Sequence, residues 1–260
     1  LGNQTRLKTA DQIIAELDSL YNTGWRRPIF FVDDNFIGNK RRLKTELLPL
    51  LIEWHKDKSE IRFRTQVSID LADDDQLMQL MVEAGFTTVF IGIETPDNEG
   101  LAECIKKQNK NRNLIENVKH IHRSGLQVEG GFIVGFDSDV PSIFQRQIDF
   151  IQKSGIVTAM VGMLQALPGT KLYDRMKREG RLQSQSSGNN IDGSTNIIPK
   201  MGLKTLIEGH SKILQYIYSP EYYYQRVKTF LNDIKPHENG ISKKIKKKGI
   251  LFRIIYQLGI

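Results

Sequence analysis

Four amphipathic segments in this chain each end at a glycine, and an apolar run follows each glycine. A glycine just past the last periodic residue is typical of a helix C-terminus, because it accepts the left-handed backbone conformation. Helices that alternate with strands predict βαβ units and a parallel sheet. The helical segments span residues 11–22, 76–84, 114–124 and 143–154 and end at Gly24, Gly85, Gly125 and Gly155; the expected strands span 29–32, 61–67, 89–93, 132–134 and 159–164.

The alternation of helical segments and apolar runs ends near residue 180. Residues 183–190 form a polar loop, and 203–218 and 220–234 then follow with helical periodicity. We therefore expect an α/β unit over residues 1–180 and a helical C-terminal region over 181–260. Within the first unit, Thr95-Pro96-Asp97 places a cap residue, a first-turn proline and an acid in the order that predicts a helix start.

The net charge of +7 is concentrated at the C-terminal end. From Lys235 onward there are seven basic residues against Glu238 alone, so the rest of the chain is near +1. A near-neutral body gives no electrostatic reason to expect nucleic-acid binding. The start of the chain has no signal-peptide pattern, and no apolar stretch approaches the roughly 20 residues of a spanning helix. We expect a cytoplasmic protein.

One cysteine, Cys104, excludes an internal disulfide. It also excludes a thiolate-held zinc or iron–sulfur site built from this chain alone, because such sites need about three or four thiolates. His120 and His122 lie two positions apart on a helical segment, where side chains point about 160–200° from each other. We therefore predict no metal ligands in this chain. Tyr222, Tyr223 and Tyr224, beside Arg226, are expected to pack between helices.

Polar residues follow the expected strands at their carboxyl ends, where parallel α/β folds gather their chemistry. A rim of carboxylates can bind a cation or a ligand amine or hydroxyl; alternatively, each acid caps the next helix. Residues 130–135 are glycine-rich but lack the lysine of a phosphate loop and flank a strand, so we expect a planar ring to lie along it. The strand-end groups are Asp33-Asp34-Asn35, Glu94-Thr95, Gly135-Phe136-Asp137-Ser138 and residues 165–170.

In this order, the strand-end motifs resemble those of radical S-adenosylmethionine (SAM) enzymes, and most closely the cobalamin-linked subgroup with a helical extension. The resemblance covers nearly the whole chain. Its motifs are Phe31-Val32-Asp33-Asp34-Asn35-Phe36, Phe90-Ile91-Gly92-Ile93-Glu94-Thr95-Pro96, Gly131-Phe132-Ile133-Val134-Gly135-Phe136-Asp137 and Leu167-Pro168-Gly169-Thr170, with Asp192-Gly193-Ser194-Thr195-Asn196, Pro199-Lys200-Met201 and Tyr218-Ser219-Pro220-Glu221-Tyr222-Tyr223 in the extension.

The resemblance implies an α/β fold, a partial (β/α)6 TIM-like barrel that lacks its first strand. It implies a [4Fe–4S] cluster that binds SAM and cleaves it reductively to a 5′-deoxyadenosyl radical, with electrons from an external donor. It also implies SAM-binding roles for specific positions. Asp33, Asp34 and Asn35 match the motif that meets the SAM amino group, and Glu94 matches the position that faces the ribose or methionine part of SAM. Gly131, Ile133 and Gly135 match the G-x-I-x-G pattern that lies against adenine. Pro168 and Gly169 match the end of the last strand.

The chain departs from the family in one respect. The C-x₃-C-x₂-C motif that holds the cluster is absent, as is the cobalamin-binding domain that usually precedes the barrel. Two explanations stay open: the chain is part of a longer enzyme, or it is a relative that has lost its cluster. In either case we expect that this polypeptide alone cannot assemble the cluster or form the radical.

Several functions fit these features. The leading hypothesis is the core of a radical SAM enzyme, such as a cobalamin-dependent C-methyltransferase, acting on a small molecule or a lipid. One alternative is a SAM-binding or scaffold module without a cluster. Another is a barrel lyase or hydrolase that uses the same carboxylates with a cation, although no lysine or histidine follows a strand to serve as base. The basic segment 243–260 predicts either peripheral membrane contact or a last helix docked on the protein.

Overall fold

The computed structural model describes residues 8–104, 106–109, 111–189 and 192–234. Helices and strands alternate along most of this length, as the glycine-terminated segments predict. Gly125 and Gly155 end their helices in the left-handed conformation, with φ of 107° and 73°. The elements are α1 (Ala10–Asn22), β1 (Ile29–Phe31), α2 (Lys40–Arg42), α3 (Leu48–Lys56), β2 (Phe63–Gln66), α4 (Asp75–Glu83), β3 (Phe86–Glu94), α5 (Asn98–Glu103), α6 (Leu114–Ser124), β4 (Gln127–Val134), α7 (Ser142–Ser154), β5 (Ala159–Met163), α8 (Lys171–Arg178), α9 (Leu203–Ile217) and α10 (Pro220–Asp233).

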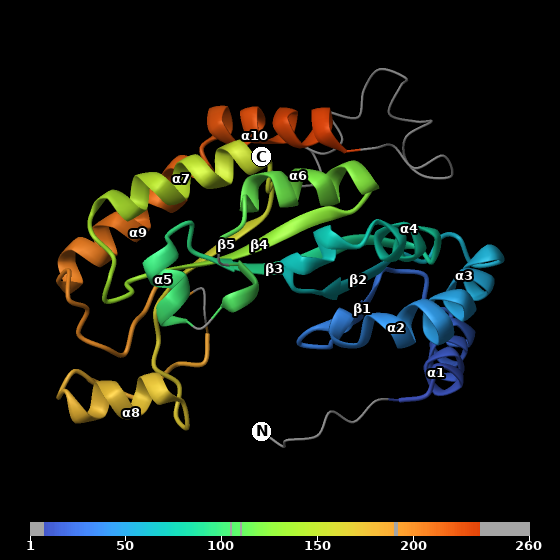
Figure 1. The fold of residues 1–260 in the computed structure, drawn as a ribbon, viewed down its shortest axis with the longest axis horizontal. Helices are drawn as coiled ribbons and strands as arrows, with labels where there is room; N and C mark the ends of the chain where they lie inside the picture. Colours follow the sequence, from blue (N-terminus) through green and yellow to red (C-terminus); the bar gives the residue numbers. More distant parts are fainter. Residues whose placement is uncertain (1–7, 105, 110, 190–191, 235–260) are drawn as a thin grey trace.

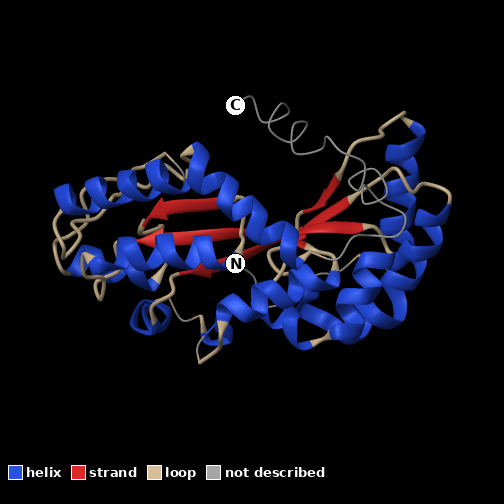
Figure 2. Cartoon of the chain, turned by 90° about the horizontal axis from the view of Figure 1, so that it is seen from above, coloured by secondary structure: helices blue, strands red, loops and turns tan. Residues whose placement is uncertain are grey.

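The five described strands form one parallel sheet in the order β1-β2-β3-β4-β5. Each strand therefore lies beside its neighbour in sequence, with a helical crossover between them. Figure 2 shows the strands fanning out as the sheet twists. The parallel α/β class expected from the sequence is confirmed. Strand β1 pairs only with β2 among the described residues, so its other edge is free.

One face of the sheet is covered by helices. Consecutive helices contact each other in chain order, α1 with α3, α3 with α4, α4 with α6 and α6 with α7. Figure 1 shows α6, α7, α9 and α10 along this side. The strand residues beneath them, such as Val89, Ile91 and Ile93, are fully buried. These residues and the apolar stripes of the helices form the main core.

Helix α9 joins the same core, and α10 packs against α6, α7 and α9. Leu206, Ile213 and Ile217 of α9 belong to the main cluster. The fully buried Arg226 of α10 donates to the carbonyl oxygens of Ile217 and Val157 and lies against the rings of Tyr218 and Tyr223. The expected interhelical packing is confirmed for Tyr223 and for Tyr222, which stacks on Tyr216 of α9, whereas Tyr224 lies against Lys228 of its own helix. Arg226 ties α10 to the loop before β5.

Some predicted boundaries are wrong. β3 and β4 begin at Phe86 and Gln127, earlier than expected, so Gly130 and Gly131 lie inside a strand instead of flanking one. Helix α5 begins at Asn98 with Asp97 as its cap, because the Thr95 hydroxyl accepts from the Asp97 amide in a turn before the helix. The helical turns between residues 36 and 56 carry no glycine signal and are absent from the prediction. Helix α8 is absent from it too, although Gly180, with φ of 68°, follows its last turn.

Candidate functional site

The face of the sheet opposite the helices differs sharply from the buried one. Alternate residues of each strand point to it, and they include glycine, charged and amide side chains that stay partly exposed. Arg64 of β2 and Glu129 of β4 form an ion pair here, across β3. We call this surface the open face. Its described members include Phe30, Arg64, Gln66, Phe90, Gly92, Glu94, Gln127, Glu129, Gly131, Ile133, Met160 and Gly162.

Two glycines meet at the centre of the open face, and neighbouring side chains lie over them. Gly92 of β3 and Gly131 of β4 are direct partners in the parallel register. A Cβ at Gly131 would lie 2.8 Å from Cζ of Phe90, and one at Gly92 would lie 2.6 Å from Oε1 of Glu94. Glycine is therefore required at both positions for the Phe90 ring and the Glu94 carboxylate to approach the sheet this closely.

Glu94 ends β3 in an unusual conformation. Its φ is 67°, a left-handed value that few non-glycine residues adopt, and such strain tends to cluster at functional sites. Lys106 pairs with its carboxylate at 2.8 Å, and the Glu94 side chain is 13% exposed. The Lys106 ammonium also lies over Gly92, 3.0 Å from where a Cβ would be. An acid, its partner and bare backbone thus meet at one point.

Two buried amides hold this strand end in place. Asn109 donates from Nδ2 to the carbonyl oxygens of Gly92 and Ile93, at 3.0 and 3.1 Å. Gln147 of α7 donates from Nε2 to Ile133 O at 2.8 Å and, more weakly, to Glu94 O at 3.5 Å. Sequence reasoning missed Lys106, Asn109 and Gln147. Only Gln147 carried a signal, as a glutamine on the apolar face of its helix.

Gly135 follows β4 at a tight turn. Its φ is 103°, and its amide and that of Phe136 donate to the Asp139 carboxylate at 2.8 and 3.0 Å. Leu206 of α9 packs against Gly135, 3.0 Å from where a Cβ would be. Burial raises the pKa of Asp139 to about 6, because the carboxylate loses its hydration. Gly131 and Ile133 thus lie on the open face, whereas Gly135 packs against Leu206 of the helix layer.

Asp33, Asp34 and Asn35 lie apart from Glu94, after β1. All three are exposed and line a cavity of about 910 Å³ beside β1, whose walls include Ile13 and Leu17 of α1. Asn35 Oδ1 accepts from the Ser68 amide at 3.1 Å, which joins the ends of β1 and β2. No described contact links these residues to Glu94. Pro168 and Gly169 occupy an exposed turn after β5, capped by Thr170 at the start of α8.

The strand-end acids do not converge on a cation. Asp137, after β4, instead pairs with Arg181, Arg175 and Lys200, and these cations hold its pKa below the usual range. The expected rim of acids is therefore wrong for Asp137. Across the residues that the structure describes, no group of three or more His, Cys, Asp or Glu side chains could hold a metal ion.

The described residues also do not fit an iron–sulfur cluster. Cys104 is the only cysteine, it is half-buried, and burial raises the pKa of its thiol. His120 bonds to Asp75 on the outside of α6, while His122 is fully buried on the inside against Phe230. The two histidines therefore point apart, as expected. No helix in the described part of the chain is long and apolar enough to cross a bilayer.

Comparison with known proteins agrees with this architecture. An uncharacterized methyltransferase of Synechocystis sp. is 43% identical over 227 residues, which cover 86% of this chain and 42% of that protein. The hopanoid C-2 methylase of Rhodopseudomonas palustris is 35% identical over 269 residues, covering 100% of this chain and 50% of that protein. The chain thus spans about half the length of these curated relatives.

The fold has a counterpart among solved structures. The radical SAM methyltransferase TsrM from Kitasatospora setae, solved with cobalamin and a [4Fe–4S] cluster bound, superposes with a TM-score of 0.58 at 14% identity, over 89% of this chain and 48% of that one. A profile described as a domain of unknown function (DUF4070) matches residues 170–260. The radical SAM superfamily profile matches residues 2–151, more than half of the chain. The chain belongs to the radical SAM superfamily.

Proposed function

We propose that this chain binds SAM on its open face. The observation that carries the proposal is the paired Gly92 and Gly131 beside the strained Glu94, which together offer bare backbone and a fixed carboxylate. In this proposal the Phe90 ring, which lies over Gly131, moves aside and the planar ring of the ligand takes its place along the strands. A carboxylate accepts hydrogen bonds from an amine or hydroxyl. Family membership supplies the ligand class.

In this proposal the residues have distinct roles. Gly131, Ile133 and Gly135 provide the surface for the adenine, and Glu94 accepts from a ribose hydroxyl or the methionine part. Lys106 pairs with Oε1 of Glu94, so Oε2 is the oxygen that accepts from SAM in this proposal. Asp33, Asp34 and Asn35 meet the amino group, and Pro168 and Gly169 close the site at the β5 end. SAM, once bound, supplies the reactive group.

For the whole protein we propose a radical SAM enzyme that performs cobalamin-dependent C-methylation on a small molecule or a lipid. The names of its relatives support methyl transfer, among them a hopanoid C-2 methylase and a bacteriochlorophyllide d C-12(1)-methyltransferase. The residues described here do not fit the cluster, so its ligands, the cobalamin and the external electron donor all come from outside them. A cytoplasmic location is part of this proposal.

The test is SAM binding by equilibrium dialysis with the purified chain. We expect Glu94→Gln to weaken binding at least about tenfold, because a charge-assisted hydrogen bond becomes a neutral one. Glu129→Gln is the matched control, an open-face acid whose charge is taken up by Arg64. Equal loss in both variants, or no SAM binding by the unaltered chain, contradicts the proposed site.

A second measurement concerns iron. After anaerobic reconstitution, we expect the isolated chain to hold far less than four iron atoms per polypeptide, because it has one cysteine. A stoichiometric four-iron cluster would contradict this. A scaffold module without a cluster would bind SAM equally well, and it differs from the enzyme in giving no SAM cleavage when the full-length protein is reconstituted with iron, sulfide and a reductant.

A further inference from the structure

Helix α8 projects from the body of the protein on the side of the open face (Figure 1). Met176 is the only fully buried residue of this helix. Leu172 and Tyr173 pack with it against a small satellite cluster that includes Phe136 and Leu164, apart from the main core. The rest of the helix surface is therefore available to another molecule.

The outer surface of α8 carries three exposed cations and one exposed acid, Asp174. Lys171, Lys177 and Arg178 are exposed, and no acid among the described residues forms an ion pair with any of them. The neighbouring Arg175 and Arg181 behave differently, because both pair with the buried Asp137. The structure thus uses two cations to fix the base of α8 and leaves three facing solvent.

Three exposed aliphatic side chains lie on the segments that flank the base of α8. Leu167, at 45% exposure, lies in the turn whose carbonyl accepts from the Thr170 hydroxyl that caps α8. Ile198, at 44%, exchanges backbone and side-chain hydrogen bonds with Arg181. Leu203, at 40%, opens α9 just after Lys200, which also reaches Asp137. We call Leu167, Lys171, Lys177, Arg178, Ile198, Lys200 and Leu203 the α8 surface.

We propose that the α8 surface docks on an anionic lipid bilayer. Unpaired lysine and arginine side chains are attracted to anionic headgroups, and aliphatic side chains among them insert at the boundary with the acyl chains. An acidic protein would satisfy the cations but gives no role to three separate exposed aliphatic residues. The surface adjoins the β5 end of the sheet, so docking would bring the open face to the bilayer. Docking itself does not depend on the proposed function. Only its purpose, which is to bring the open face to the bilayer, rests on that function.

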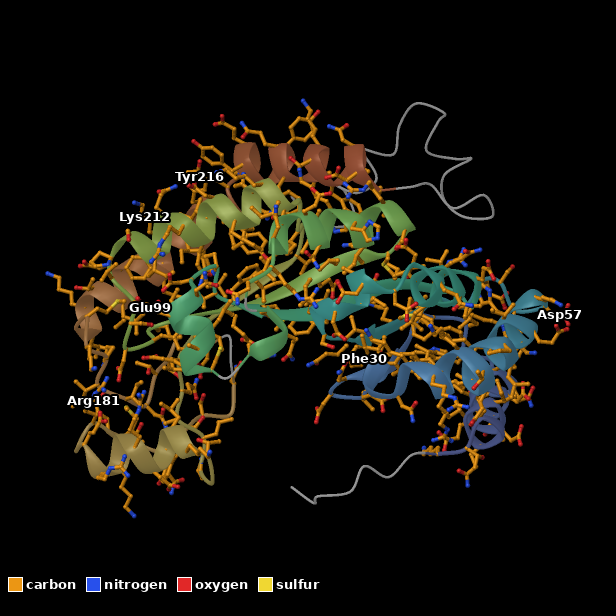
Figure 3. All side chains as sticks on the ribbon, viewed as in Figure 1. Phe30, Asp57, Glu99, Arg181, Lys212 and Tyr216 are labelled. Atoms are coloured by element: carbon orange, nitrogen blue, oxygen red, sulfur yellow. The ribbon has the colours of Figure 1, made fainter. Side chains whose placement is uncertain are left out.

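The experiment is co-sedimentation of the full chain with vesicles of phosphatidylglycerol and phosphatidylcholine, or of phosphatidylcholine alone. We expect binding to the anionic vesicles and at least about tenfold weaker binding for Lys171→Gln/Lys177→Gln/Arg178→Gln. The matched control is Arg41→Gln/Lys56→Gln/Lys212→Gln, which removes the same charge from exposed positions elsewhere. Figure 3 shows Lys212 well away from the α8 end, which Arg181 marks.

The aliphatic part needs its own variant. Ile198→Ser/Leu203→Ser keeps every charge, and we expect it to remove the part of the binding that resists high salt. The basic segment 243–248 is present in all variants, so binding that the α8 variant leaves unchanged overturns the proposal. Failure of the chain to bind anionic vesicles overturns the proposal too. If an immobilised acidic polypeptide retains the chain through α8 while the vesicles do not, the partner is an acidic protein and the proposal is again overturned. None of these measurements depends on SAM.

Discussion

The two faces of the sheet differ in the burial and polarity of their side chains. On the helix-covered face, alternate residues of β3 are Val89, Ile91 and Ile93, all fully buried. On the open face, the residues between and after them are Phe90, Gly92 and Glu94, which stay partly exposed. Parallel sheets usually bury both faces. A parallel sheet with one polar, glycine-bearing face therefore points to a ligand or another part of the protein on that side.

The largest expected effect is a difference in the free energy of unfolding between substitutions on the two faces of the sheet. Ile91→Ala removes a fully buried side chain under the helices, and we expect the free energy of unfolding to fall by about 2–5 kcal/mol. Ile133→Ala removes a partly exposed side chain on the open face, and we expect a loss of less than about half as much. Urea unfolding of both variants measures this. Equal losses would mean that the open face is as tightly packed as the covered one.

The next prediction concerns the helix layer and pH. His122 is buried on α6 without a hydrogen-bond partner in the described structure, and burial lowers its pKa to about 3. The folded pKa lies below the unfolded value, about 6.5. The proton-linked cost of burying His122 is therefore zero above about pH 6.5, and stability falls as the pH drops through that value toward 3.

Between pH 7 and pH 5 this loss amounts to about 2 kcal/mol. We expect His122→Leu to gain that much stability relative to the unaltered chain over this interval, and His120→Leu, on the exposed side of α6, to gain little. Comparing each variant with the unaltered chain cancels the opposite contribution of Asp139, whose raised pKa adds stability as the pH falls below about 6. Parallel pH profiles for all three proteins would show that His122 is hydrated.

The smallest expected effect concerns two neighbouring glycines of β4, which lie on opposite faces of the sheet. Gly131→Ala places a methyl group against the Phe90 ring, and Gly130→Ala places one 2.7 Å from the Phe132 ring on the covered face. We expect each to cost about 1 kcal/mol of stability, at the low end for overpacking. Only Gly131→Ala should also weaken SAM binding, several-fold, by dialysis. Weakening by both variants to the same extent would indicate a general loss of folding.

Local sequence signals predicted much of the fold. Helix-ending glycines, apolar runs and strand-end polar residues are properties of neighbouring positions, so they predicted the alternation of helices and strands and the α/β class. They also identified Glu94 and Gly131 as candidates, with the family resemblance supplying their roles. The boundaries of β3 and β4 were missed because Thr87, Thr88, Gln127 and Glu129 break the apolar run, although a strand with one open face tolerates them.

By itself, the sequence determined the alternation of helix and strand, the glycines and acids at the strand ends, and the single cysteine that excludes a cluster held by this chain alone. The tertiary structure decided which charges meet. Glu94 pairs with Lys106, whereas Asp137 pairs with Arg181 and the neighbouring cations and does not contribute to the site. The reason is physical. Secondary structure follows from interactions within a few residues, whereas the partner of a buried charge depends on segments that only folding brings together.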